Sequence, residues 1–191
     1  MRFRLLAVFA LVLAPLAVRA ADEENPYKSA KVGDFAEYKL TTKVGDLSIP
    51  GTMRQVVTEK TDKELTLKIV SAVEFGGQKK ENEQTQKIDL TKPFDPTKGG
   101  AVPGGGKVDI EKLKDGKEKV KIDGKEYDTS WTTYKAKMKV FGQDIESEMK
   151  VWTSKDMPLG MLKMTMTGKF AGQDMESAVE LTKFGNKKEK E

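Results

Sequence analysis

The chain has 191 residues, with 34 Lys or Arg against 30 Asp or Glu and a formal net charge of +4. It contains no Cys and no His. Structural zinc sites, thiol nucleophiles, Ser-His or Cys-His catalysis and haem ligation through His are therefore excluded. Basic and acidic residues are interspersed along the sequence and form no basic patch, which argues against nucleic acid as a partner.

The first twenty residues have the pattern of a secretory signal peptide. Arg2 and Arg4 precede the apolar run 5–18, and Val18 and Ala20 are small residues before a cleavage site after Ala20. The run is shorter than the ~20 residues that span a bilayer, and no second apolar run follows. We therefore expect a periplasmic or secreted protein with no integral membrane segment after cleavage. Removal of this segment takes three basic residues, which lowers their number from 34 to 31 against 30 acidic ones.

After a polar leader at 21–30, the sequence has the signals of antiparallel strands. The stretch "ELTLKIVSAVEF" (64–75) places Leu65, Leu67, Ile69 and Val73 on one face by alternation. Turn sequences follow at short intervals: "VGD" at 44–46, "KTDK" at 60–63, "GGQ" at 76–78, and "DGK" at both 115–117 and 123–125. Strands of this length joined by such turns predict a meander.

Residues 91–107 interrupt this pattern, because eight of the seventeen positions are Pro or Gly. We expect a long loop between two β blocks of a single domain that spans 31–184. Its end resembles a phosphate-binding loop but lacks the first Gly, at Ala101, and the Ser or Thr, at Val108.

The second block contains an internal echo, "KVFGQDIESEMKV" (139–151) and "KFAGQDMESAVEL" (169–181), each with a central Gly-Gln turn. A helix is the competing interpretation, because Tyr134, Met138 and Phe141 recur at helical spacing. The Gly at 142 and the β-branched residues before it favour strands. A bulge or bend is expected near Thr132, where the apolar face of 125–140 changes parity. The stretch 108–114 is expected to form one short helical turn.

These patterns predict an all-β protein with little helix, folded as a curved antiparallel sheet or half-barrel of about nine strands. A charged tail is expected at 185–191. The predicted strands are 35–43, 47–59, 64–75, 78–89, 117–122, 125–140, 144–153, 160–170 and 174–184.

Six of the nine Met residues lie within 149–175. Thioethers are soft ligands that select Cu(I), so a copper-binding protein is a remote alternative. Strand alternation instead places Met164 and Met166 on one face with Leu162, as in a core. Acidic residues at Asp144, Glu146 and Glu148 alternate among Lys, which favours a solvated face over a pair of glycosidase carboxylates. We expect no enzyme and no cofactor.

The stretch "VWTSKDMPLGMLKMTMTG" (151–168), followed by "QDMESAVELTKF", resembles a pattern in which a strand ends in Trp, an acidic-Pro hairpin loop follows, and two strands lead to a Phe. It is similar to the LolA/LolB-type lipoprotein-carrier half-barrels and related exported bacterial β-sheet proteins. The resemblance covers mainly residues 117–184. It implies a half-barrel whose concave face holds an acyl chain, and it brings no catalytic residues.

We therefore expect an exported, non-catalytic binding protein for a hydrophobic small molecule or lipid. The alternative is an envelope protein-interaction or structural module with a filled core, whose partner is another protein. The candidate cavity-lining residues are Leu67, Ile69, Trp131, Met149, Trp152, Met164 and Met166.

Overall fold

The computed structural model describes residues 25–97, 108–140, 143–170 and 172–187. The predicted signal peptide, most of the Pro/Gly-rich loop and the end of the charged tail lie outside these residues. One short 3-10 helix, η1 (Pro26–Ser29), precedes a single antiparallel sheet. Its nine strands are β1 (Asp34–Val44), β2 (Leu47–Lys60), β3 (Glu64–Phe75), β4 (Gln78–Asp89), β5 (Val108–Ile122), β6 (Lys125–Val140), β7 (Gln143–Thr153), β8 (Met161–Phe170) and β9 (Gln173–Asn186).

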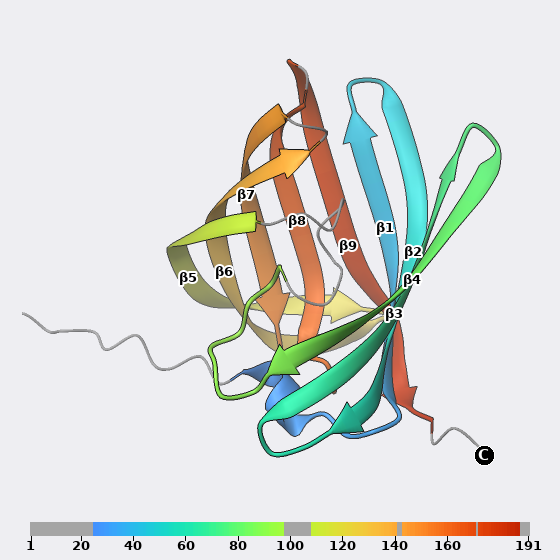
Figure 1. The fold of residues 1–191 in the computed structure, drawn as a ribbon. Coiled ribbons are helices and arrows are strands. Elements are labelled where there is room, and N and C mark those ends of the chain that lie inside the picture. Colours follow the sequence, from blue (N-terminus) through green and yellow to red (C-terminus); the bar gives the residue numbers. More distant parts are fainter. Residues whose placement is uncertain (1–24, 98–107, 141–142, 171, 188–191) are drawn as a thin grey trace, which may run out of the picture.

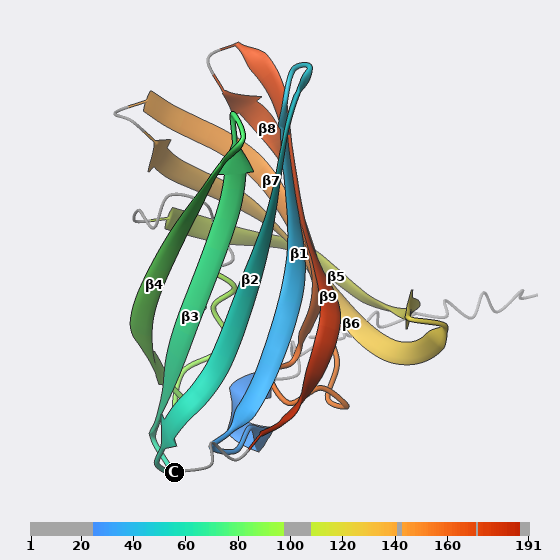
Figure 2. The same cartoon turned by 90° about the vertical axis from the view of Figure 1, so that its right-hand side faces the viewer.

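The order of the strands across the sheet is β4-β3-β2-β1-β9-β8-β7-β6-β5. The first and last strands are therefore neighbours at the centre, and β4 and β5 are the edges. The sheet curves strongly without closing, as Figures 1 and 2 show. The predicted all-β half-barrel of nine strands is thus confirmed.

Two local predictions in β5 are wrong. The stretch 108–114 is extended, and the "DGK" at 115–117 continues the strand, because Asp115 and Gly116 pair with Thr132 and Trp131 of β6. A Cβ at Gly116 would approach the Trp131 ring to 2.6 Å, so a glycine is needed there for close packing, not for a turn. The second "DGK" does form the β5–β6 hairpin, with φ of 47° at Asp123 and 82° at Gly124.

The concave face carries the main core. Alternation along the central strands places buried side chains inward, and these form one cluster that extends from Leu65 on β3 to Met149 on β7. At the lower end in Figure 1, η1 and the β7–β8 loop close this core. Tyr27 packs against Phe94 with ring centroids 5.8 Å apart.

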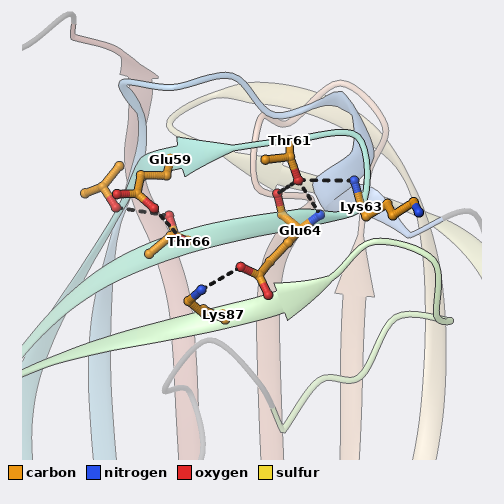
Figure 3. Close-up of polar contacts among 7 residues, drawn as sticks. Glu59, Thr61, Lys63, Glu64, Thr66 and Lys87 are labelled. Carbon is orange, nitrogen blue, oxygen red and sulfur yellow. Dashed lines mark hydrogen bonds and ion pairs between the residues drawn. The ribbon is translucent and has the colours of Figure 1, made fainter.

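The β2–β3 turn at the same end is held by side-chain hydrogen bonds (Figure 3). The Thr61 hydroxyl accepts hydrogen bonds from the backbone N–H of Lys63 and Glu64, at 3.3 and 3.0 Å. Glu64 in turn pairs with Lys87 of β4 at 2.8 Å. These contacts join three consecutive strands at the closed end of the half-barrel.

Candidate functional site

Five of the seven predicted lining residues lie together on the concave face. Leu67 and Ile69 come from β3, Met149 from β7, and Met164 and Met166 from β8. All five belong to the same core cluster and are at most 1 % exposed. Here the thioethers fill space between strands, the role for which their flexibility suits them.

The two tryptophans lie on the opposite, convex face. Trp131 and Trp152 are directly paired across β6 and β7, whereas the next pair along, Thr132 and Val151, points inward. The ammonium group of Lys150 lies 4.4 Å from the centroid of each indole ring. The structure therefore separates these two residues from the five others and gathers them around a cation.

The end of the β5–β6 hairpin extends behind β9, on the convex side of the sheet (Figures 1 and 2). Glu118 of β5 accepts a hydrogen bond from the Trp152 indole N–H and lies 3.3 Å from Lys150 Nζ. The indole hydrogen bond, followed by Lys150, lowers the pKa of the Glu118 carboxyl. Tyr127 of β6 meets Phe184 of β9 edge to face at 6.4 Å. Tyr127 is 7 % exposed and belongs to the main core cluster, so this contact attaches the end of β6 to β9.

The lower end of the concave face is closed by backbone and side-chain contacts. Lys60 Nζ donates to the carbonyl oxygens of Lys28, at 2.6 Å, and Ala30. Tyr27 is buried, and burial raises the pKa of its phenol. Gly160 of the β7–β8 loop packs so closely on η1 that a Cβ there would lie 2.1 Å from Pro26 Cβ. Ligand access from this end would require these contacts to break.

The upper part of the concave face is open on the β1–β3 side. One rung of directly paired residues runs from Met164 through Val179, Leu40 and Gly51 to Val73. Along it, exposure rises from 0 % at Met164 and 2 % at Val179 to 40 % at Val73, with Leu40 half-buried between them. The apolar lining thus continues beyond the packed core to a region in contact with water. Sequence reasoning placed Val73 on the core face but did not identify this opening, because exposure depends on the curvature of the sheet.

A separate basin of about 960 Å³ lies outside the closed end, between η1, the β7–β8 loop and the β5–β6 hairpin. Its walls combine Lys28, Lys117 and Lys119 with Asp128 and Asp156. None of the five buried residues named above lines it. Its mixed charges differ from the apolar lining expected for a hydrophobic ligand.

Two of the carboxylates considered for catalysis, Glu146 and Glu148, are exposed. Glu146 forms ion pairs with Lys135 and Lys137 at 3.1 and 3.2 Å, and these lysines lower the pKa of its carboxyl. Among the described residues, no group of three or more acidic side chains is placed to hold a metal ion. Within the same residues, no helix is long and apolar enough to span a membrane.

No protein-family model matches the chain. A search of curated proteins likewise finds no match. Among solved structures, one from Bacteroides fragilis, described as an exported protein with a YmcC-like fold, aligns with a TM-score of 0.52 at 8 % identity. The alignment covers 82 % of this chain and 97 % of that one.

Two further solved structures align less closely. A protein of Parabacteroides distasonis described as a lipoprotein has a TM-score of 0.45 at 8 % identity, over 83 % of this chain and 98 % of that one. An outer membrane lipoprotein-sorting domain of Vibrio parahaemolyticus has a TM-score of 0.29 at 9 % identity, over 90 % and 92 %. At identities this low, the structural similarity indicates a shared fold and nothing more. Of these three alignments, the one with the Bacteroides fragilis structure supports the shared fold. The chain shares its curved-sheet fold with this Bacteroides fragilis protein, which agrees with the weak resemblance drawn from the sequence.

Proposed function

We propose that this chain is an exported, non-catalytic binding protein that holds an acyl chain or similar extended apolar ligand on the open part of its concave face. The observation that carries the proposal is the rung from Met164 to Val73, along which an apolar lining passes from full burial to 40 % exposure. An apolar chain laid on Leu40 and Val73 would remove their surface from water and join the existing core.

Export is supported by the signal-peptide pattern of residues 1–20 and by the description of the Bacteroides fragilis protein as exported. We assign the protein to the periplasm or the extracellular space. The five buried residues Leu67, Ile69, Met149, Met164 and Met166 would form the floor beneath the ligand rather than its whole binding surface. The two tryptophans on the convex face would not contact it.

The alternative, an envelope protein-interaction module, draws support from the close packing of the lower half of the core. The edge strand β4 weakens it, because this edge is lined by Lys79, Lys80, Glu81 and Glu83, which oppose strand addition. We therefore favour the concave face over the sheet edge as the binding surface.

The test combines native mass spectrometry with a fluorescent probe that carries an acyl chain in a neutral ester. Protein purified from the envelope of its host should carry lipid, and delipidated protein should bind the probe. Val73→Glu and Leu40→Glu, which put a charge on the open apolar surface, should weaken probe binding by more than about tenfold. Leu113→Glu is the control, since Leu113 is similarly exposed, at 47 %, but lies on the edge strand β5.

Equal probe affinity in all three variants would show that the probe binds elsewhere. Lipid-free protein from the envelope, together with no probe binding by the unmodified chain, would contradict the proposal and favour the interaction module.

A further inference from the structure

One rung of the concave face contains a polar group without a partner. Directly paired residues cross the sheet in the order Ile110, Ala136, Ser147, Gly168, Met175 and Val44. Ser147 is 5 % exposed, and its hydroxyl oxygen finds no hydrogen-bond partner within the described part of the chain. Buried hydroxyl groups are usually bonded, so this one calls for an explanation.

The hydroxyl group faces the concave side. Ile145, Ser147 and Met149 alternate inward on β7 and are buried, whereas Glu146 and Glu148 between them are exposed on the convex side. The other two buried serines with a described environment are bonded: Ser177 lies 3.1 Å from the Thr42 hydroxyl, and Ser154 accepts a hydrogen bond from the Asp156 N–H. Ser147 is thus set apart from its counterparts by its missing partner.

The surroundings of Ser147 are small and uncharged. Its cross-strand neighbours are Ala136 and Gly168, and a Cβ at Gly168 would lie 3.0 Å from Ser147 Cβ. On the adjacent rung, which passes through Met149, the charged residue is Lys112 at the β5 edge, and its ammonium group is paired with Asp115 at 3.3 Å. An anion at Ser147 would therefore be desolvated without a cation to balance it.

We propose, on the basis of the function inferred above, that Ser147 anchors the polar end of the ligand, and that this end is an uncharged acyl carbonyl, as in an ester or amide. The hydroxyl group donates to the carbonyl oxygen, while the acyl chain extends over the apolar side chains of the same face. The ligand class is then a neutral acyl ester or amide rather than a free fatty-acid anion. Ile110 and Val44, at the two ends of this rung, are half-buried, so the rung reaches water at both margins.

The experiment compares three ligands of equal chain length: monolauroyl glycerol, the N-lauroyl amide of ethanolamine, and laurate at about pH 8, where a carboxyl group is ionised. Methyl NMR of labelled methionines reports binding through Met149 and Met166, which flank the site. The two neutral ligands should bind at least about tenfold more tightly than laurate. A preference between ester and amide identifies the source of the carbonyl.

Ser147→Ala should weaken binding of the two neutral ligands by about tenfold and leave laurate nearly unchanged. Ser154→Ala, at the closed end, is the control and should bind all three ligands as the unmodified chain does. Without ligand, Ser147→Ala should also melt at a higher temperature, because it removes an unpaired buried hydroxyl, whereas Ser154→Ala should melt at a lower one.

The outcomes separate this inference from the proposed function. If none of the three ligands binds, the proposed function fails. If laurate binds as tightly as the neutral ligands, or Ser147→Ala retains full affinity for them, the apolar site stands and the role of Ser147 is wrong. A lower melting temperature of ligand-free Ser147→Ala would show that the hydroxyl already has a partner, which also overturns the inference.

Discussion

At the residue scale, strand alternation places Lys150 on the convex face of β7, where a side chain would ordinarily face solvent. Its ammonium group is instead surrounded by partners. Trp131 and Trp152 provide ring faces for the cation, and Glu118 binds both Lys150 and the Trp152 indole. These contacts attach the β5–β6 hairpin to the convex face. Because Glu118 stays partly exposed, each contact is weakened by water, and we expect the cluster to hold an orientation more than to add much stability.

The lowered pKa of Glu118 gives the contribution of this cluster a definite pH dependence. A group whose pKa is lowered by folding stabilises the fold above its unfolded pKa, about 4.3 for Glu, and this contribution is lost as the pH falls through the folded pKa. Glu118→Gln should therefore reduce the free energy of unfolding by up to about 1 kcal/mol at neutral pH, and the difference should vanish in acid.

Urea unfolding of the two proteins at a series of pH values, followed by tryptophan fluorescence, measures this difference. Glu148→Gln on β7, which also removes one exposed negative charge, is the control. A Glu118→Gln difference that stays constant from neutral to acidic pH would mean that the carboxylate charge does not contribute.

At the scale of elements, the sequence predicts the strands well and their environment poorly. Eight of the nine expected strands agree with the observed bounds to within two residues at each end, because alternation and Gly-centred turns are local signals. The ninth, β5, begins at 108 and not at 117, since its pairing with the long β6 overrides the local "DGK" turn signal. The bulge expected near Thr132 on β6 lies instead on β5, where the register shifts between Lys112 and Lys114, whereas β6 pairs with β7 without a shift.

The candidate site was predictable only in part, for the same reason. Alternation correctly grouped Met164 with Met166. Alternation along β7 by itself separates Trp152 from Met149, so grouping these two on one face was inconsistent with the pattern. That Trp131 also faces away from Met149 depends on the register between β6 and β7. Alternation also could not show that the Ser147 hydroxyl is unpartnered, which depends on residues of three different strands.

The β7–β8 loop, "SKDMPLG" (154–160), packs against η1 and helps to close the lower end of the core. Gly160 has φ of 75° and lies against Pro26 of η1. Gly160→Ala combines an unfavourable backbone conformation with a steric clash, and should lower the free energy of unfolding by about 2–4 kcal/mol. Gly124→Ala is the matched control, because it has φ of 82° but no atom within 4 Å of the added Cβ, and should cost about 1 kcal/mol. Thermal or urea unfolding measures both, and equal losses would show that contact with η1 is unimportant.

At the scale of the whole molecule, the first and last strands pair at the centre of the sheet. Strand β1 pairs with β9, and the two halves, β1–β4 and β5–β9, are joined through this ladder. The curved face that we assign to ligand binding crosses the same junction, since its rungs pass from Met164 on β8 through Leu40 on β1. Binding and folding therefore depend on one long-range strand pairing, which is slow to form because its residues are far apart in sequence.

Proline substitutions test this dependence directly. Val179→Pro on β9 removes a ladder hydrogen bond between two neighbouring strands and is expected to prevent folding, with loss of the β-sheet circular dichroism signal. On the edge strand β4, the backbone N–H groups of successive residues point alternately toward β3 and toward solvent. The milder of Gln84→Pro and Thr85→Pro should therefore retain the fold and binding of the fluorescent acyl-ester probe. A folded Val179→Pro protein, or complete unfolding by both β4 substitutions, would contradict a sheet whose stability is concentrated at the β1–β9 junction.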